Sequence, residues 1–355
     1  MATRLRRTAV LGGFAAGDRV PGRGFQVLAI ATGVSTYLLI VVGGVVRVSG
    51  SGLGCGSAGG RNDWPYCQGG LLPPMQREAI IEFSHRWLAA TVSTLALALL
   101  AVAWGRYRHL RAVAWTATFF SIFLVAQVIL GAVTVYNLLP PDIVMTHLAN
   151  AELLLGCAVL LCILAFNGGR IRNPRKVDAS PAQRRAALLA AVAAAGTYVL
   201  VISGAFVVAK GAGYACDGWP LCGNGVQLDS SQLASYNLLH RGIAATVSVL
   251  IALAVMSVAR AWRPHRGIRL AGVVVSALLV AQIVAGAVLV ETRLPTAARS
   301  IHEALGSALW ASVILLALLV RPGMLAPERM AADRHPPVIE AARGAGQRVP
   351  AGTAS

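Results

Sequence analysis

Eight apolar stretches, each long enough to cross a lipid bilayer, are the feature that most constrains this chain. Crossing the hydrocarbon core takes about 20 residues of helix, at a rise of roughly 1.5 Å per residue. The composition agrees, because 56% of the residues are hydrophobic and 13% are charged, against about 25% charged in soluble domains. The sequence therefore predicts an all-α membrane protein with eight transmembrane helices. The predicted spans are 26–47, 79–103, 112–135, 143–166, 186–208, 235–259, 269–291 and 298–321.

The formal net charge is +17, and the positively charged residues are distributed along the chain as the predicted membrane topology requires. Most Lys and Arg residues lie in the N-terminal arm, the C-terminal tail and three segments near 104–111, 167–185 and 260–269, whereas the alternate loops hold few of them. This is the positive-inside pattern, which predicts a plasma-membrane protein with both termini in the cytoplasm. A basic inner face also suits anionic lipid headgroups, so the charge does not indicate a nucleic-acid partner.

Two halves of the chain are similar to each other. When the sequence is displaced by 155 residues, HRWLAATVSTL at 85–95 falls on HRGIAATVSVL at 240–250, and LVAQ at 124–127 falls on LVAQ at 279–282. Each half holds four spans, so we expect two four-helix bundles as parallel repeats about an axis along the membrane normal. The predicted units are a cytoplasmic arm (1–25), an N-terminal half (26–166), a cytoplasmic linker (167–185), a C-terminal half (186–321) and a tail expected to be disordered (322–355).

Four of the seven histidines fall inside predicted spans, each within about two turns of the outer end of an even-numbered span. They pair across the repeat at the same displacement and are His85, His147, His240 and His302. Ionisable groups at membrane depth are costly and usually functional, and two imidazoles from different helices suit a six-coordinate haem iron. A hydrogen-bonded helix contact would explain one such histidine but not four, and structural zinc needs a closed set of four ligands. The other three, expected to be solvated in basic segments, are His109, His265 and His335.

Charged residues accompany the histidines, and the repeat preserves only some of them. Arg86 and Arg241 each follow a histidine; haem propionates are natural partners for them, and snorkelling to the outer headgroups is the alternative. Glu82 falls on Asn237 and lies three residues before His85, hence on the same helix face. A carboxyl beside an iron site can move protons, so this difference suggests chemistry in the first half and a held cofactor in the second. The alternative is that Glu82 only stabilises the start of its helix.

The cysteines divide into loop pairs and one pair within a span. Those in the predicted outer loops are Cys55 and Cys67, which frame the Trp-Pro of DWPYC, and Cys216 and Cys222, which frame that of GWPLC. On an oxidising outer face we expect two disulfides, although a redox-active dithiol is an alternative for the first pair, whose loop is longer. Cys157 and Cys162 are expected to be packing residues.

Together these residues resemble the haem A synthase family, membrane enzymes that serve terminal oxidase assembly. The resemblance rests on VRVSGSGLGC, DWPYC, EFSHR, GWPLC and LLHR, with His147 and His302, and it covers roughly residues 26–321. It implies the conversion of haem O to haem A, in which a porphyrin methyl group is hydroxylated twice and the gem-diol loses water to give a formyl group.

The resemblance also implies a division of labour between the halves. His240 and His302 would be the axial ligands of a haem b cofactor, whereas His85 and His147 would flank the iron of the substrate haem O, with Glu82 as the proton-handling carboxylate. Haem O synthase and an electron acceptor are implied as partners, beside membrane lipid, and a homo-oligomer is left open.

Two other functions are compatible with paired histidines. A di-haem electron carrier linked to quinol would need the same four ligands but no acid in one half only. A haem or solute transporter would suit parallel repeats, but the spans are not broken at matching midplane positions. The sequence therefore favours the enzyme.

Overall fold

The structure, a computed structural model, describes residues 20–56, 66–171, 173–174, 177–222 and 232–324. Within these ranges it consists of eight long helices and one short 3-10 turn. The elements are α1 (Arg23–Val48), α2 (Arg77–Arg106), α3 (Arg111–Tyr136), α4 (Pro141–Phe166), α5 (Pro181–Ala209), η2 (Ala212–Tyr214), α6 (Gln232–Ala261), α7 (Arg266–Glu291) and α8 (Thr296–Val320). All eight helices are long and apolar enough to cross a membrane. The all-α, eight-span prediction is confirmed, and the protein is a multi-pass membrane protein.

The start of α5 differs from the predicted span, because the helix begins at Pro181 instead of near residue 186. Ser180 caps it by accepting a hydrogen bond from the backbone N–H of Gln183, and the Gln183 side chain accepts one from the backbone N–H of Ser180. This reciprocal capping box, with a proline in the first turn, starts a helix within polar sequence. The last residues of the predicted linker are therefore helical.

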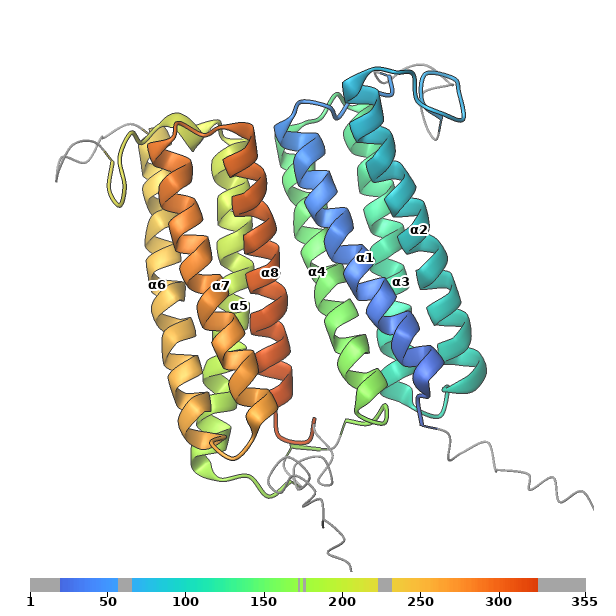
Figure 1. The fold of residues 1–355 in the computed structure, drawn as a ribbon, viewed down its shortest axis with the longest axis vertical. Coiled ribbons are helices and arrows are strands. Elements are labelled where there is room, and N and C mark those ends of the chain that lie inside the picture. Colours follow the sequence, from blue (N-terminus) through green and yellow to red (C-terminus); the bar gives the residue numbers. More distant parts are fainter. Residues whose placement is uncertain (1–19, 57–65, 172, 175–176, 223–231, 325–355) are drawn as a thin grey trace, which may run out of the picture.

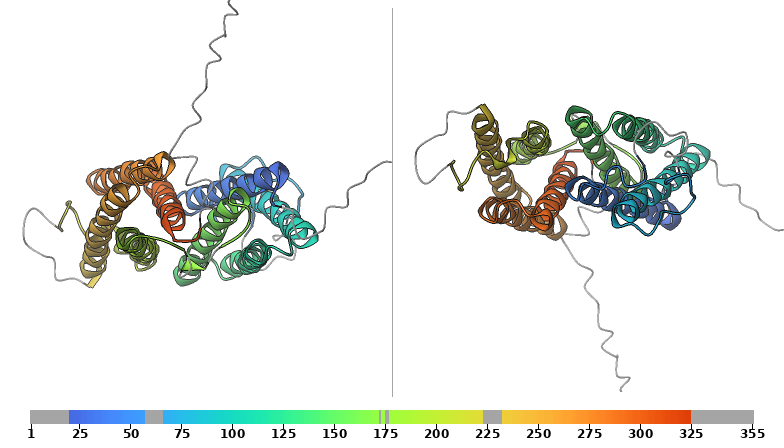
Figure 2. Two further views of the ribbon diagram at one scale, coloured as in Figure 1. Left: turned by 90° about the horizontal axis from the view of Figure 1, so that it is seen from below. Right: turned by 90° about the horizontal axis from the view of Figure 1, so that it is seen from above.

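The helices form two groups of four (Figures 1 and 2). In the first group, α1 and α3 each pack against both α2 and α4, so α2 and α4 lie diagonally across the bundle. In the second group, α5 and α7 each pack against both α6 and α8, which are again diagonal. The histidine-bearing helices thus occupy opposite corners of each bundle.

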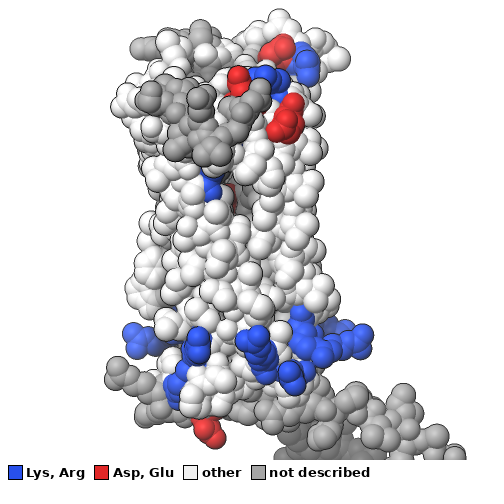
Figure 3. Space-filling view, turned by 90° about the vertical axis from the view of Figure 1, so that its left-hand side faces the viewer, with Lys and Arg blue, Asp and Glu red and all other residues white. Residues whose placement is uncertain are grey.

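Basic side chains gather at one end of the molecule. On the face that Figure 3 shows, Lys and Arg side chains form a band there. In the sequence, the segments that join α2 to α3, α4 to α5 and α6 to α7 all hold Lys or Arg residues. The start of α1 and the end of α8 lie at this same end (Figure 1). The Arg residues before Val20 and the tail after Met324 lie outside the described residues.

One loop histidine is not solvated as expected. His265 is 2% exposed, because it precedes the first residue of α7 and its ring packs against Trp262 with the ring centroids 5.2 Å apart. The prediction that His265 is solvated was wrong, because its ring packs against Trp262 and is buried. His109 is half-buried, and His335 lies outside the described residues.

The two bundles meet along a seam formed by α1 and α4 on one side and α5 and α8 on the other. Two tyrosines cross it in matching positions. The Tyr37 hydroxyl donates to the Ala304 carbonyl over 3.2 Å, and the Tyr198 hydroxyl donates to the Ala149 carbonyl over 3.1 Å. In these two tyrosine contacts, each half supplies one hydrogen-bond donor and one acceptor.

Carboxyl groups also lie in the seam. Glu152 is fully buried, its Oε1 accepts from the Ser307 hydroxyl over 2.5 Å, and its backbone carbonyl accepts from the Trp310 indole over 2.9 Å. Closer to the outer end, Arg47 and Glu303 form an ion pair of 2.7 Å across the seam. Polar contacts between membrane helices add specificity to van der Waals packing, so these groups fix how the bundles dock.

Replacing the seam tyrosines tests this docking. Tyr37→Phe and Tyr198→Phe should each lower the free energy of unfolding by about 0.6 kcal/mol, the average for a hydrogen bond between membrane helices. Reversible unfolding in mixed micelles measures the effect, and Tyr136→Phe, exposed at the end of α3, is the matched control. Two seam variants as stable as the control would show that these hydrogen bonds do not hold the bundles together.

Candidate functional site

Each of the four membrane histidines packs against a glycine of the preceding helix. A Cβ atom built on that glycine would lie only 2.9–3.3 Å from the imidazole Cε1, closer than nearly all side-chain contacts. The pairs are His85 with Gly43, His147 with Gly131, His240 with Gly204 and His302 with Gly286. Because the odd-numbered helices carry glycine at these four positions, the imidazoles have room to lie within the bundles.

The structure places each predicted histidine pair in one bundle. His85 on α2 and His147 on α4 belong to the first bundle, and His240 on α6 and His302 on α8 belong to the second. Since α2 and α4 are diagonal, as are α6 and α8, the paired rings come from opposite corners of one bundle. Among the described residues no three or more His, Cys, Asp or Glu side chains form a metal-binding group. Each half thus offers two nitrogen donors.

A glutamine accompanies one histidine in each half. The Gln127 amide lies 3.1 Å from Nε2 of His147, and the Gln282 amide lies 3.3 Å from Nε2 of His302. Both glutamines end the repeated LVAQ motif, so the sequence already held the signal, although no role could be assigned to it. In the first half alone, Asn150 donates to the Gln127 side-chain oxygen over 2.7 Å.

Three imidazoles carry a buried nitrogen with no hydrogen-bond partner among the described residues. They are the Nδ1 atoms of His85, His147 and His302. Nδ1 of His240 instead lies 2.8 Å from the hydroxyl of Ser203. Buried polar atoms without partners are costly and uncommon in native proteins, so these rings are arranged for an interaction beyond the protein's own side chains.

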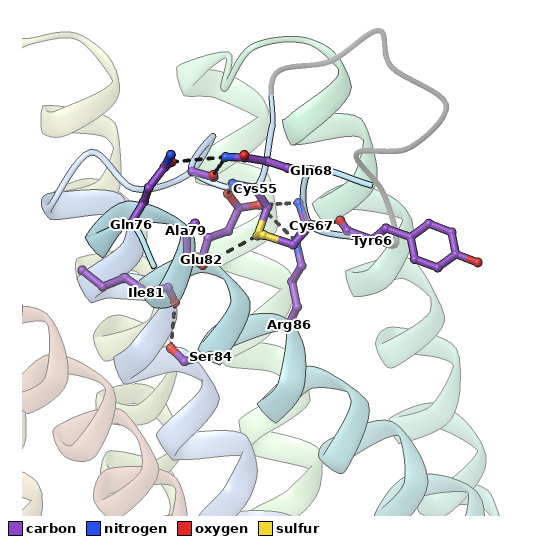
Figure 4. The surroundings of a disulfide bond; sticks show 11 residues. Cys55, Tyr66, Cys67, Gln68, Gln76, Ala79, Ile81, Glu82, Ser84 and Arg86 are labelled. Carbon is purple, nitrogen blue, oxygen red and sulfur yellow. Dashed lines mark hydrogen bonds and ion pairs between the residues drawn. A yellow bond between two sulfur atoms is a disulfide. The ribbon is translucent and has the colours of Figure 1, made fainter. Parts of the chain in front are cut away.

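Glu82 holds the first outer loop against α2 (Figure 4). It is 3% exposed; its Oε2 accepts from the backbone N–H of Cys55 over 2.8 Å, and its Oε1 accepts from Nε of Arg86 over 3.1 Å. Nη2 of Arg86 completes the ion pair with Glu82, and Nη1 donates to the Tyr66 carbonyl over 2.5 Å. The two predicted site residues are therefore bound to each other and to the loop.

The second half builds a matching clamp with an amide. Nε of Arg241 donates to the Asn237 side-chain oxygen over 2.8 Å, and the Asn237 amide donates to the Ala212 carbonyl over 3.0 Å. Nη1 of Arg241 donates to the carbonyls of Gly218 and Pro220. Glu82 and Asn237 thus occupy equivalent places, and each arginine binds loop carbonyls.

The loop cysteines form the expected disulfides. Cys55 is bonded to Cys67, and Cys216 is bonded to Cys222. All four are buried beneath the outer loops, and Trp64 and Pro65 lie outside the described residues. Cys157 and Cys162 are free thiols that pack against the N-terminal core, as expected.

Comparison with known proteins identifies the family. Residues 75–314, which span parts of both bundles and all four membrane histidines, match the COX15-CtaA family model, described as a cytochrome oxidase assembly protein. The chain belongs to this family. The resemblance seen in the sequence motifs is thereby confirmed.

Curated relatives of this family are similar to the chain over most of their length. The heme A synthase of Shouchella clausii (strain KSM-K16) is 29% identical over 285 residues, covering 80% of this chain and 92% of the relative. The heme A synthase of Bacillus licheniformis is 27% identical over 295 residues, covering 82% and 95%. That of Lysinibacillus sphaericus (strain C3-41) is 26% identical over 295 residues, covering 82% and 94%.

Removing Arg86 and neutralising Glu82 should lower the free energy of unfolding by different amounts. Arg86→Ala leaves a buried carboxylate without its cation and should destabilise the protein by about 3–5 kcal/mol. Glu82→Gln keeps an oxygen acceptor and should cost about 1–2 kcal/mol. Unfolding of the oxidised protein in micelles measures both, with exposed Arg77→Ala as the control. If the double variant Glu82→Gln, Arg86→Ala is not more stable than Arg86→Ala alone, the clamp assignment is wrong.

Proposed function

We propose that this protein is a haem A synthase, an oxidoreductase that converts the ring methyl group of haem O to a formyl group by two successive hydroxylations for terminal oxidase assembly. The family match and the relatives named heme A synthase support this function. The observation that carries it is the pair of half-buried imidazoles in each four-helix bundle, every ring backed by a glycine.

The residues present fit haem. Two imidazoles per bundle match the axial ligand set of a six-coordinate iron, and three of the four rings hold a buried Nδ1 without a partner among the described residues. Nη2 of Arg241 is also buried without such a partner, which leaves a cationic donor for a propionate. Arg86 is committed to Glu82 and Tyr66, so its predicted contact with a propionate needs a rearranged clamp. A bound haem would supply an iron centre that accepts and donates single electrons.

We assign different roles to the two bundles. His240 and His302 are the proposed axial ligands of the resident haem b, whereas His85 and His147 are proposed to hold the iron of the substrate haem O. The proposed orientation places the basic band and both termini in the cytoplasm, so the histidines lie in the outer half of the membrane. Haem O synthase, an electron acceptor and a homo-oligomer stay predictions of the family resemblance.

Glu82 is the proposed proton-handling group. Breaking a C–H bond of the methyl group leaves a proton to be taken up, and Glu82 lies on α2 one helical turn before His85. Arg86 is its ion-pair partner, while the equivalent Asn237 carries no ionisable side chain. This difference supports chemistry in the first bundle only.

A di-haem electron carrier is the second candidate. The matching clamps favour it, because Glu82 and Asn237 both hold an outer loop and Glu82 therefore has a structural use without catalysis.

The enzyme and the carrier differ in their products. Purified protein supplied with haem O and an oxidant system should release haem A, with the hydroxylated haem as an intermediate, when extracted haems are separated by chromatography. Two stably bound low-spin haems without hydroxylated or formylated product would favour the electron carrier.

Two substitutions test the division of labour. His240→Ala should remove most haem from the purified protein, because the second bundle loses an axial ligand. Glu82→Gln, which keeps one oxygen acceptor for the clamp, should retain the haem spectrum but should lower product formation by about 10²-fold or more, where about 10²–10⁴ is the usual range for a general acid–base group. Full haem content in His240→Ala, or full turnover in Glu82→Gln, would contradict these assignments.

A further inference from the structure

We infer that Ser203 is a positioning residue that fixes the tautomer of His240 and strengthens it as an axial ligand of the resident haem. The inference rests on the proposed function of the second bundle and extends it to a residue on α5.

The argument starts from the single hydrogen of the Ser203 hydroxyl. This hydroxyl lies 2.7 Å from the Leu200 carbonyl, one turn earlier on α5, and 2.8 Å from Nδ1 of His240 on α6. The carbonyl can only accept, so the hydroxyl donates its hydrogen to Leu200. The hydroxyl oxygen must then accept from His240, which places the imidazole proton on Nδ1. Nε2 of His240 is left with a lone pair for a metal.

This relay, the hydrogen bonds from His240 through Ser203 to the Leu200 carbonyl, is found in the second bundle alone among the described residues. Gly43 on α1 and Gly204 on α5 hold equivalent places against His85 and His240, so the residue before each glycine is also equivalent. This residue is Val42 in the first bundle and Ser203 in the second. Val42 has no hydroxyl, and the His85 ring interacts directly with the backbone of Leu39, the counterpart of Leu200. The scaffold therefore does not require the serine.

A hydrogen bond from the far nitrogen of a metal-bound imidazole has a known effect. It orients the ring and raises the basicity of the ligating nitrogen, and removing such a partner weakens metal binding by about 10–100-fold. A more basic ligand stabilises the ferric iron relative to the ferrous iron. Ser203 should therefore lower the midpoint potential of the haem in the second bundle and slow its loss.

The experiment uses full-length protein carrying His85→Ala, so that haem is held by the second bundle. In this background Ser203→Ala should shift the haem midpoint potential to more positive values and speed haem transfer to an acceptor protein about 10-fold or more. Ser203→Thr keeps a hydroxyl that can donate to a carbonyl of the preceding turn and should restore both values. Ser248→Ala is the control, because among the described residues its hydroxyl bonds only to the Ala244 carbonyl on α6.

A second measurement needs no bound haem. In protein labelled with ¹⁵N-histidine and freed of haem, the His240 signals should report a proton on Nδ1, and Ser203→Ala should alter this tautomer signature. An unchanged potential and unchanged imidazole signals in Ser203→Ala would overturn the inference, as would equal effects of Ser203→Ala and Ser203→Thr. Haem retained by His240→Ala would instead refute the ligand assignment of the proposed function, whatever Ser203 does.

Discussion

The bilayer interior contains almost no water, so a polar nitrogen within a helix bundle needs a partner from the protein or from a ligand. Four imidazoles face this constraint here, and the rest of the architecture follows from how they are accommodated. Glycines on the odd-numbered helices make room for the rings, and diagonal placement of the even-numbered helices directs two rings into each bundle.

The helix count and the histidine pairs were predictable from sequence, because apolar length and a repeat of identical residues are local properties of the chain. The correspondence between α1 and α5 was missed for a physical reason. Both carry a glycine against a histidine, Gly43 and Gly204, but the longer first outer loop displaces them by 161 residues instead of 155. Displacing the whole sequence by 155 residues therefore does not align Val42 with Ser203.

The clamps could not be predicted either, because they depend on how an outer loop folds back over a helix end. Glu82 is separated from the Cys55 N–H by 27 residues, and only the disulfide-bonded loop brings them together. Sequence spacing put Glu82 on the same helix face as His85 but could not show that Arg86 would be its partner. The same holds for Glu152, whose partner Ser307 lies in the other bundle.

Some of the differences between the bundles lie at neighbours of the histidines. Asn150 supports Gln127 in the first bundle, where the second has Leu305, and Ser203 contacts His240 in the second, where the first has Val42. Glycine backing, diagonal helices and loop clamps are common to both. A hydrogen bond to one nitrogen of an imidazole orients the ring and raises the basicity of the other nitrogen. One scaffold can thus present its paired histidines in two different surroundings.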